Sequence, residues 1–327
     1  MSAARATHFH AVIPVFEDWE AAALLLARLD AACAATKREG RVLLVDDGSS
    51  TRPGDALQGP YRALSEVEIL RLARNMGHQR AIAIGLTFLH QERDPAEAVV
   101  VLDADGEDRP EDVPALLAEF ERLGGETVVF AERARRSEGL VFRAFYQLYR
   151  AIHFLLTGIA VRVGNFSVLP WSALATFVVV SEAWNHYAAA VFKARIPRAT
   201  LPLARGERLA GRSTMNFVAL ALHGLSAISV FGEIVGGRLL LTACAGLATF
   251  VVLLAACCAA AWAGWLELPP WLGVWIFVSM LLCAQFVILA FVITFSILNA
   301  RNSLSFLPVR DYKYFVAGAT RLFPRTP

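Results

Sequence analysis

The sequence predicts an α/β domain built on a mostly parallel sheet, followed by two membrane-spanning helices. Short apolar runs alternate with helix-like segments over the first part of the chain, and two long apolar segments fill much of its last third. The composition agrees, since 56% of the 327 residues are hydrophobic, only 18% are charged and the mean hydropathy is +0.49. An ordinary soluble domain is less apolar than this, so part of the chain is expected in a membrane.

The charge and the cysteines exclude several classes of protein. A formal net charge of +2 argues against a strongly basic nucleic-acid-binding protein and against a disordered acidic chain. The five cysteines form no Cys-x-x-Cys pair, so neither a disulfide framework nor a zinc site is expected. The first residues lack the apolar region and the cleavage site of a secretory leader. The polar first half is therefore expected to stay in the cytoplasm.

The N-terminal part of the chain shows the strand–helix rhythm of βαβ units. Its short apolar runs end in charged or glycine-containing turns, and helical stretches separate them. The expected strands are residues 9–16, 42–45, 67–72, 99–102 and 127–130, and the expected helices are residues 19–35, 79–89 and 113–123. This order is typical of a mostly parallel sheet covered by helices.

Two apolar segments, 239–266 and 271–298, are each long enough to cross a hydrocarbon core of about 30 Å. The short connection between them, which contains Pro269 and Pro270, predicts a helical hairpin. Arginine and lysine flank the hairpin but do not occur in its loop, so both chain ends are expected in the cytoplasm. These flanking residues are Arg205, Arg208, Arg212, Arg238, Arg301, Arg310 and Lys313. The alternative is a buried helical pair in a soluble protein, but such long soluble helices show a polar stripe.

Two further segments, 140–157 and 215–235, are expected to be helices lying on the membrane surface. In the first, Arg143, Gln147 and Arg150 form a narrow polar stripe on an otherwise apolar helix. The second is nearly long enough to span, but a third crossing would place the C-terminus outside, against the distribution of positive charge. The alternative for both segments is an amphipathic helix packed on a soluble core.

Two groups of carboxylates follow predicted strands, at the sheet edge where parallel sheets bind ligands. Asp46 and Asp47 follow one strand, and Asp103, Asp105 and Glu107 follow another. In an extended chain the last three would point their oxygens to one side, which suits Mg²⁺ or Mn²⁺ bridged to a diphosphate. Neither a P-loop nor a dinucleotide-binding motif is present. The alternative is an ordinary solvated turn or helix start, where aspartate is favoured as a cap.

The order of short motifs resembles a family-2 glycosyltransferase of the GT-A fold. The motifs are Ile13-Pro14-Val15-Phe16-Glu17-Asp18, Val45-Asp46-Asp47-Gly48-Ser49, Arg74-Asn75-Met76-Gly77-His78 with Ala81 and Gly85, and Leu102-Asp103-Ala104-Asp105 with Pro110-Glu111. The downstream features are similar to the polyprenyl-phosphate branch, which includes dolichol-phosphate mannose synthase and the bactoprenol-phosphate glucosyltransferases. These features are Arg133, Arg136, the Gly164-Asn165-Phe166 turn, Arg205-x-x-Arg208-x-x-Gly211-x-Ser213 and the terminal hairpin. The resemblance extends over residues 10–316.

The resemblance implies roles for individual positions. Pro14, Phe16, Asp46 and Asp47 match positions that hold the nucleoside, and Asp103, Asp105 and Glu107 match those that hold metal and diphosphate. The positions expected around the donor and acceptor phosphates are Arg133, Arg136, Arg205, Arg208 and Ser213, and the catalytic set is Asp105, Arg133 and Arg136. Arginine suits phosphate because it presents a fixed fork of donors and stays charged. The alternative for the basic residues is attraction to anionic lipid.

Several residues depart from the family pattern. Glu17 and Asp18 replace an Asn-Glu pair, which leaves recognition of the base or ribose open, Glu107 replaces a glutamine, and Arg109 stands where proline is common. Asn165 stands where many relatives carry an aspartate proposed as a catalytic base. A hydroxyl acceptor would lose about 10²- to 10⁴-fold in rate without a base. A lipid phosphate, whose second pKa is roughly 6, is already ionised and needs none.

The resemblance thus implies inverting, metal-dependent transfer of a sugar, taken as a UDP-hexose, to a polyprenyl phosphate. The expected place is the cytoplasmic face of a bacterial inner membrane, and the expected cofactor is Mg²⁺ or Mn²⁺. The expected partners are the nucleotide sugar, the lipid phosphate, membrane lipids and further copies of this chain, with no nucleic acid. The expected organisation is a core at 1–136, an acceptor-side region at 137–238, the hairpin at 239–298 and a cytoplasmic tail at 299–327.

Three other functions stay open at this point. A processive polysaccharide synthase would carry a Gln-x-x-Arg-Trp motif, whereas Gln147-Leu148-Tyr149-Arg150 is followed here by Ala151. A glycosyltransferase acting on a lipid hydroxyl is motivated by Asn165. A catalytically inactive membrane partner is motivated by the departures at Glu17, Glu107 and Arg109.

Overall fold

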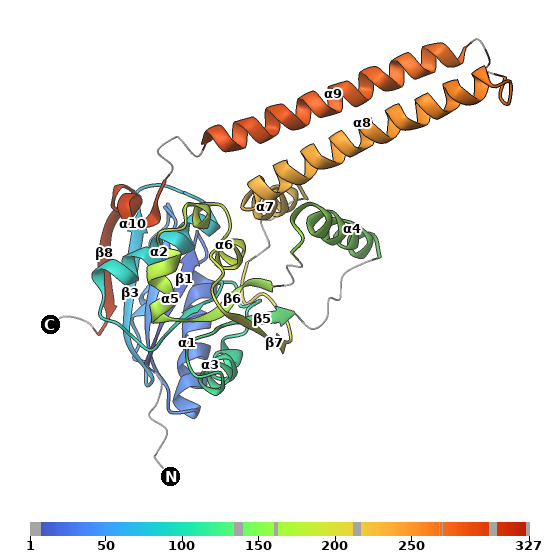
Figure 1. Cartoon of the computed structure of the whole chain (residues 1–327). Helices are drawn as coiled ribbons and strands as arrows, with labels where there is room; N and C mark the ends of the chain where they lie inside the picture. Colours follow the sequence, from blue (N-terminus) through green and yellow to red (C-terminus); the bar gives the residue numbers. More distant parts are fainter. Residues whose placement is uncertain are drawn as a thin grey trace. The chain divides into compact units, whose positions relative to one another are not determined.

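A computed structural model describes residues 8–133, 140–159, 163–211, 217–267, 269, 271–300 and 306–324. The chain divides into two compact units. One unit contains Met1–Phe145, Val161–Val230 and Phe306–Pro327, and the other contains Tyr146–Ala160 and Phe231–Ser305. The first unit holds the sheet, and the second holds two long apolar helices (Figure 1).

The first unit is built on an eight-stranded sheet with the order β7-β5-β6-β4-β1-β2-β3-β8. Its strands are β1 (His8–Val15), β2 (Glu39–Asp46), β3 (Leu64–Leu72), β4 (Ala98–Val101), β5 (Val128–Arg133), β6 (Val163–Pro170), β7 (Arg198–Leu203) and β8 (Val316–Phe323). Strand β6 runs antiparallel to β4 and β5, β8 runs antiparallel to β3, and the other neighbours pair in parallel. The mostly parallel α/β sheet predicted from the sequence is confirmed.

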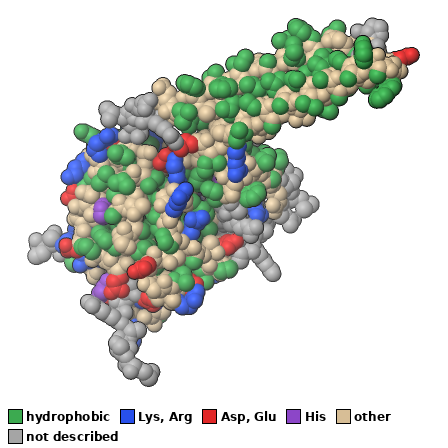
Figure 2. Space-filling view, in the orientation of Figure 1, with side chains coloured by type: hydrophobic (Ala, Val, Ile, Leu, Met, Phe, Trp, Pro, Cys, Tyr) green, Lys and Arg blue, Asp and Glu red, His purple; other side chains and the backbone are tan. Residues whose placement is uncertain are grey.

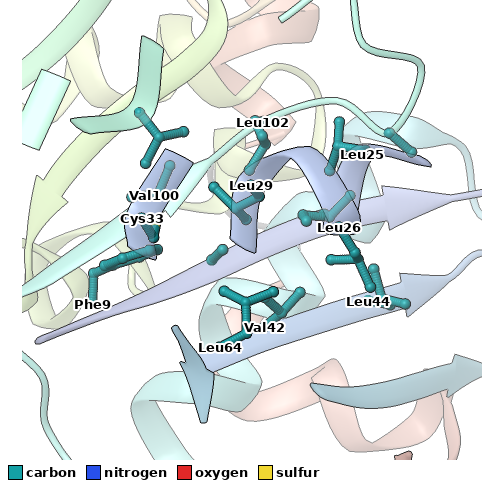
Figure 3. Close-up of a cluster of buried hydrophobic side chains, with 14 of the residues drawn as sticks. Phe9, Leu25, Leu26, Leu29, Cys33, Val42, Leu44, Leu64, Val100 and Leu102 are labelled. Atoms are coloured by element: carbon teal, nitrogen blue, oxygen red, sulfur yellow. The ribbon is translucent and has the colours of Figure 1, made fainter. Parts of the chain in front are cut away.

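Helices cover both faces of the sheet because successive strand residues point to opposite sides. In β2, Val42 and Leu44 pack in one buried cluster with α1 (Trp19–Ala35) and α3 (Val113–Arg122). Leu43 and Val45 pack in the other cluster with α2 (His78–Glu92), α5 (Trp171–Phe177) and α6 (Tyr187–Lys193). Figure 3 shows the first cluster, with Leu25, Leu26 and Leu29 of α1 against the strands. Both faces are therefore apolar, as expected of parallel strands.

The second unit contains the apolar helices α8 (Gly232–Trp262) and α9 (Leu272–Ala300), which run side by side (Figure 1). Both are long and apolar enough to cross a membrane, and their side chains are mostly exposed. Hydrophobic side chains cover the visible face of this pair in Figure 2. Between the two helices, Oγ1 of Thr294 donates to the carbonyl oxygen of Gly236 at 3.1 Å. The two predicted apolar helices are confirmed.

The surface helices differ in part from the sequence expectation. Helix α4 (Leu140–Thr157) has the predicted bounds, and within the second unit Arg238 donates to the carbonyl oxygen of its Leu155 at 2.8 Å. The predicted helix 215–235 is wrong as one segment, because α7 (Phe217–Ser229) ends and α8 begins at Gly232. Helix α8 thus begins seven residues before the predicted apolar segment 239–266, and these added residues include the charged Glu233 and Arg238.

The residues after the second long helix return to the sheet. They form α10 (Pro308–Asp311) and then β8, which pairs with β3. Tyr312 is buried, with 2% of its surface exposed, and its hydroxyl donates to Glu92 of α2 at 2.6 Å. The segment from Phe306 onward is therefore part of the first unit.

Candidate active site

The first two carboxylates of the site fix the backbone beyond β2. The register of the sheet places Asp46 beside Val15, so the ends of β1 and β2 coincide. Buried Asp46 accepts the backbone N–H of Ser49 at 2.9 Å and Nε of Arg71 at 3.2 Å. Asp47 accepts two backbone N–H groups, from Met76 at 2.6 Å and Gly77 at 2.9 Å. Burial nevertheless raises the pKa of Asp47.

Two motifs that are separate in the sequence thus form one structure. The turn after Asp47 packs against the loop before α2 so closely that a Cβ at Gly48 would lie 2.5 Å from the carbonyl carbon of Arg74. The φ of Gly48, +75°, is also one that glycine adopts readily. These contacts hold the start of α2, with His78 as its first residue, at the carboxyl edge of the sheet.

Glu17 binds the loop that follows β2. Its carboxylate accepts the hydroxyl groups of Ser50, at 2.7 Å, and Thr51, at 2.5 Å, while its own N–H donates to Oγ of Ser49 at 3.0 Å. The hydrogen bonds from Thr51 and Ser50 lower the pKa of Glu17 to about 2. The backbone of Glu17 has a φ of +56°. Glu17, which departs from the family pattern, therefore binds the loop after β2.

The acidic segment after β4 is a turn, not the extended chain that the alternating carboxylates predicted. Gly106 has a φ of +82° at the turn, so the three side chains do not simply alternate. The N–H of Glu107 donates to Oδ1 of Asp105 at 3.0 Å, and the N–H of Asp103 donates to Oδ2 of Asp108 at 3.2 Å. The buried carboxylate of Asp108, not singled out as a site residue from the sequence, helps to shape this acidic turn (residues 103–108).

The loop after β7 lies on the acidic turn and brings two arginines to it. This arginine loop (residues 204–210) is docked by two backbone hydrogen bonds of 2.8 Å, from Gly206 to Glu107 and from Leu209 to Asp105. Its side chains form ion pairs with the same turn. Arg205 pairs with Glu107, and Arg208 binds Asp105 at 3.1 Å and also pairs with Asp18. The structure thus brings the predicted acidic and basic groups together.

Asn165 of β6 lies beside Asp103. Its amide nitrogen is 3.4 Å from Oδ1 of Asp103 and 2.9 Å from Nε2 of His78. The same His78 nitrogen is 3.0 Å from Oδ1 of Asp103. Burial opposes protonation of His78, but the neighbouring carboxylates, Asp103 foremost, raise its pKa overall. Asn165 therefore contacts the acidic turn through Asp103.

The carboxylates suit a hard cation in chemistry but are not gathered around one. Among the described residues, no three His, Cys, Asp or Glu side chains are arranged to hold a metal ion. Asp105 and Glu107 face arginines instead. Burial first, and then the nearby charge of Asp103, raise the pKa of Asp105. Carboxylate oxygens are ligands that fit Mg²⁺ or Mn²⁺, and Asp105 and Glu107 could bind such an ion once their ion pairs with Arg208 and Arg205 open.

The remaining predicted residues fall in three places. Pro14 is buried within β1, and Phe16, just beyond it, has 51% of its surface exposed. Arg133 is the last residue of β5, and its side chain is not described. Arg136 and Ser213 lie outside the described residues.

A comparison with known families decides what kind of domain holds this site. The family described as "Glycosyl transferase family 2" matches residues 11–175. The chain belongs to glycosyl transferase family 2. This match includes the ends of β1, β2 and β4, the start of α2 and Asn165 of β6. The prediction of a family-2 glycosyltransferase is confirmed.

Curated relatives are similar to part of this family-2 chain. An undecaprenyl-phosphate 4-deoxy-4-formamido-L-arabinose transferase of Photorhabdus laumondii is 32% identical over 148 residues, which are 45% of this chain and 43% of that protein. A protein of the same name from Pseudomonas fluorescens is 38% identical over 118 residues, 36% of this chain and 33% of that protein. The chain thus spans less than half the length of these relatives.

Solved structures show weaker likeness to this family-2 chain. Glucosyl-3-phosphoglycerate synthase of Mycobacterium tuberculosis, in complex with Mn²⁺, UDP and phosphoglyceric acid, is 13% identical with a TM-score of 0.49, over 70% of this chain and 79% of that one. Mannosyl-3-phosphoglycerate synthase of Rubrobacter xylanophilus is 14% identical with a TM-score of 0.47, over 68% and 72% of the two chains. Likeness of this size carries no conclusion about the present chain.

A pocket opens beside the acidic turn of this family-2 domain. It lies between the turn, the arginine loop and strands β5, β6 and β7. Its lining residues are Glu107, Asp108, Ala131, Glu132, Gly164, Phe166, Leu203, Ala204 and Arg205. Sequence reasoning missed Glu132 and Gln79 as neighbours of the site, because a single acid or amide in a strand or helix start carries no distinguishing pattern. It also missed Asp108, which follows the three alternating carboxylates but does not continue their alternation.

Proposed function

We propose that this family-2 glycosyltransferase transfers a sugar from a nucleotide sugar to a polyprenyl phosphate, with a divalent cation held by Asp103, Asp105 and Glu107. One observation carries the proposal: the acidic turn and the arginine loop meet at the carboxyl edge of the sheet. Carboxylates suit the cation, and guanidinium groups suit the phosphates of donor and acceptor. The lipid phosphate is supported by the relatives, which are named for undecaprenyl phosphate.

The arginines change partners in this proposal. When bound, the cation would neutralise the charge that develops on the leaving diphosphate. Arg205 and Arg208 would then leave the acidic turn and contact phosphate oxygens, while Asp18 remains beside Arg208 and keeps the loop near the site. Arg133, Arg136 and Ser213 are proposed around the same phosphates. The exposed ring of Phe16, with Pro14, Asp46 and Asp47, is proposed to hold the nucleoside, taken as uridine.

The acceptor is proposed to attack without a general base. An ionised phosphate oxygen carries its own negative charge, so the chain needs to orient it rather than remove a proton. Asn165 cannot act as a base near neutral pH. Direct attack from the face opposite the leaving diphosphate gives inversion at the anomeric carbon.

The membrane side of the proposal is supported by exposed apolar surface. In α4, Leu148, Phe154 and Leu155 are exposed, and in α7 so are Leu222 and Leu225. These faces suit helices lying at the lipid surface, where a polyprenyl chain presents its phosphate. Several tryptophans are exposed around the connection of α8 and α9, as is typical of the membrane–water interface. They are Trp262, Trp265, Trp271 and Trp275.

Nucleotide release tests the proposal directly. The purified protein in detergent is incubated with UDP-, GDP- and dTDP-sugars and Mg²⁺ or Mn²⁺, with and without undecaprenyl phosphate. Release that requires one donor, the cation and the lipid phosphate is expected. Release that ignores the lipid phosphate would shift the acceptor to another lipid, one bearing a hydroxyl. The lack of any metal-dependent binding of a nucleotide sugar would instead favour an inactive membrane partner.

Replacing one carboxylate of the turn tests the cation site. Asp105→Asn keeps the shape of the side chain and removes its charge, so turnover is expected to fall on the order of 10²-fold or more, since even outer-shell changes at metal sites cost roughly 10- to 100-fold. Asp55→Asn, in the exposed turn η1 (Asp55–Gln58), is the matched control and should leave turnover unchanged. Substantial activity in Asp105→Asn with a normal melting temperature would remove this residue from the site.

A further inference from the structure

A chain of hydrogen bonds leads from a buried backbone group to the acidic turn. The backbone N–H of Tyr187, at the start of α6, donates to Oε1 of Gln79 at 2.6 Å. Gln79, with 8% of its surface exposed, donates in turn through Nε2 to Oδ1 of Asn165 at 3.2 Å. Tyr187 is itself fully buried, and its hydroxyl lies 2.7 Å from Oγ of Ser167 on β6. The Tyr187 end of this series of hydrogen bonds is thus buried in the core.

The direction of every bond in this chain follows from its first donor. A backbone N–H can only donate, so the atom of Gln79 that faces it must be the amide oxygen. The other end of Gln79 is therefore the NH₂ group, and the atom of Asn165 that faces it must be oxygen. The NH₂ group of Asn165 is consequently turned toward Asp103 and His78, at 3.4 and 2.9 Å. Nε2 of His78 can accept from this NH₂ group only when it carries no proton. When Nε2 is protonated it donates to Asp103, and the NH₂ group of Asn165 then has Asp103 as its acceptor.

We propose that Asn165 is a positioning residue for Asp103, and that Gln79 acts on Asp103 only through Asn165. Asn165 and His78 both approach Oδ1 of Asp103, which fixes the direction in which the second oxygen points. The inference rests on the proposed function, because orienting Asp103 matters if this carboxylate holds the cation. It gives position 165 a role that involves no proton transfer, and it adds Gln79 to the residues that shape the site.

An aspartate at position 165 could not perform this role. One of its oxygens would still accept from Gln79, but the other would face the carboxylate of Asp103 where the NH₂ group of Asn165 now lies 3.4 Å from Oδ1. The donor would be replaced by a second negative charge, which repels Asp103. Asn165→Asp is therefore expected to lower turnover. If position 165 were instead the place of a lost base, the same substitution would raise turnover.

Binding of Mn²⁺ alone tests the proposal without relying on catalysis. The affinity of the full-length protein in detergent for Mn²⁺ is measured by electron paramagnetic resonance for the wild type, Asn165→Ala, Gln79→Met and the double variant. Each single variant is expected to bind Mn²⁺ about 10-fold more weakly, as is typical of lost outer-shell partners. The double variant should be no weaker than the weaker single variant, because one residue acts through the other. Gln91→Met, at an exposed position of α2, is the matched control and should bind as the wild type does.

The outcomes separate this inference from the proposed function. Wild-type protein that binds Mn²⁺, with binding lost in Asp103→Asn, keeps the proposed cation site. If in that case Asn165→Ala retains full affinity, the inference is wrong while the proposed function stands. A lower melting temperature in Gln79→Met with unchanged Mn²⁺ affinity would show that Gln79 only supports α6, and independent, additive losses would also overturn the inference. Wild-type protein that binds no Mn²⁺ would overturn the cation site and this inference together.

Discussion

Buried carboxylates in the sheet unit bind backbone N–H groups and so determine where loops lie. Asp47 does this at the site, with Met76 and Gly77. Asp30 of α1 does it away from the site, where its Oδ1 accepts the backbone N–H groups of residues 62–64 at 2.8, 2.7 and 3.0 Å. Charged acceptors form stronger hydrogen bonds than neutral ones. A single side chain thus fixes the loop that leads into β3.

Removing Asp30 should therefore destabilise the protein more than an ordinary substitution. Asp30→Ala leaves three backbone donors without this acceptor, with an expected cost of about 3 to 5 kcal/mol. Asp30→Asn retains the accepting oxygen but not its charge, and about half of that loss is expected. Chemical unfolding of both variants in detergent measures the difference. Equal stability of Asp30→Ala and wild type would show that water replaces the carboxylate at no cost.

His10 of β1 gives the protein a defined sensitivity to acid. It is buried with 4% of its surface exposed, its Nε2 lies 3.3 Å from the carbonyl oxygen of Asp94, and burial lowers its pKa to about 4. The unfolded chain binds a proton near pH 6.5, whereas the folded chain does so only near pH 4. Stability is therefore expected to fall by about 3 kcal/mol as pH decreases from 6.5 to 4, and not to change through this group above 6.5.

A substitution that cannot titrate separates this effect from other acid effects. His10→Gln retains a donor for the carbonyl group of Asp94, so its unfolding free energy should decrease less steeply between pH 6.5 and 4 than that of the wild type. Gln91→Met, an exposed position of α2 that carries no titratable group, is the control and should keep the wild-type slope. Identical slopes for His10→Gln and the wild type would contradict the assignment to His10.

At the scale of elements, the contact between the acidic turn and the arginine loop depends on a glycine. Gly106 has a φ of +82°, and a Cβ at this position would lie 2.3 Å from Cγ of Leu209. Gly124, after α3, has nearly the same φ, +83°, but a Cβ there would meet nothing within 4 Å. The two glycines therefore share a backbone conformation, but only at Gly106 would a side chain displace a neighbour.

Alanine at these two glycines separates backbone strain from displacement of the arginine loop. Both Gly106→Ala and Gly124→Ala should lose about 1 to 2 kcal/mol of stability through the left-handed backbone. Only Gly106→Ala should also push Leu209 and the arginine loop away from Asp105, and we expect turnover to fall roughly 10-fold, as at other outer-shell positions. Melting temperature and nucleotide release measure the two effects. Equal turnover in both variants would mean that the loop tolerates the displacement.

Helices and strands were predictable where neighbouring residues carry a helical period or form a continuous apolar run. The bounds of α1 and α4 match those expected from helical periodicity, and strands β1 to β5 come from continuous apolar runs. Strand β7 alternates exposed and half-buried residues, and β8 is largely exposed, so neither has such a run. Strand β8 pairs with β3 across more than 200 residues of sequence. A pattern of neighbouring residues cannot predict such a distant pairing.

The site was predictable as a set of residues but not as a geometry. The carboxylates and arginines were expected together because they follow strand ends and match family motifs. The turn at Gly106, the ion pairs of Arg205 and Arg208, and the link from Gln79 to Asn165 depend on loops that come from distant segments. Hydrogen-bond partners of this kind follow from the tertiary fold, which sequence spacing does not give.

At the scale of the whole molecule, the path of the chain constrains its arrangement in a membrane. The chain leaves the sheet unit after Val230, forms α8 and α9, and re-enters the sheet unit at Phe306. One folded unit lies on one side of a bilayer, so helices that cross must do so an even number of times. The distribution of positive charge independently predicts the same hairpin, with both of its ends on one side.

Labelling of single introduced cysteines tests this arrangement. Trp265→Cys, between the two long helices, should react with a membrane-impermeant maleimide in intact cells, because the connection is expected on the outer side. Arg321→Cys, an exposed position on β8, should react only after the membrane is permeabilised. Wild-type protein is the control, since Cys244, Cys257, Cys258 and Cys283 lie in the apolar helices and Cys33 is buried. Labelling of Arg321→Cys in intact cells would place the sheet unit, and with it the donor site, on the outer side, where nucleotide sugars made in the cytoplasm do not reach.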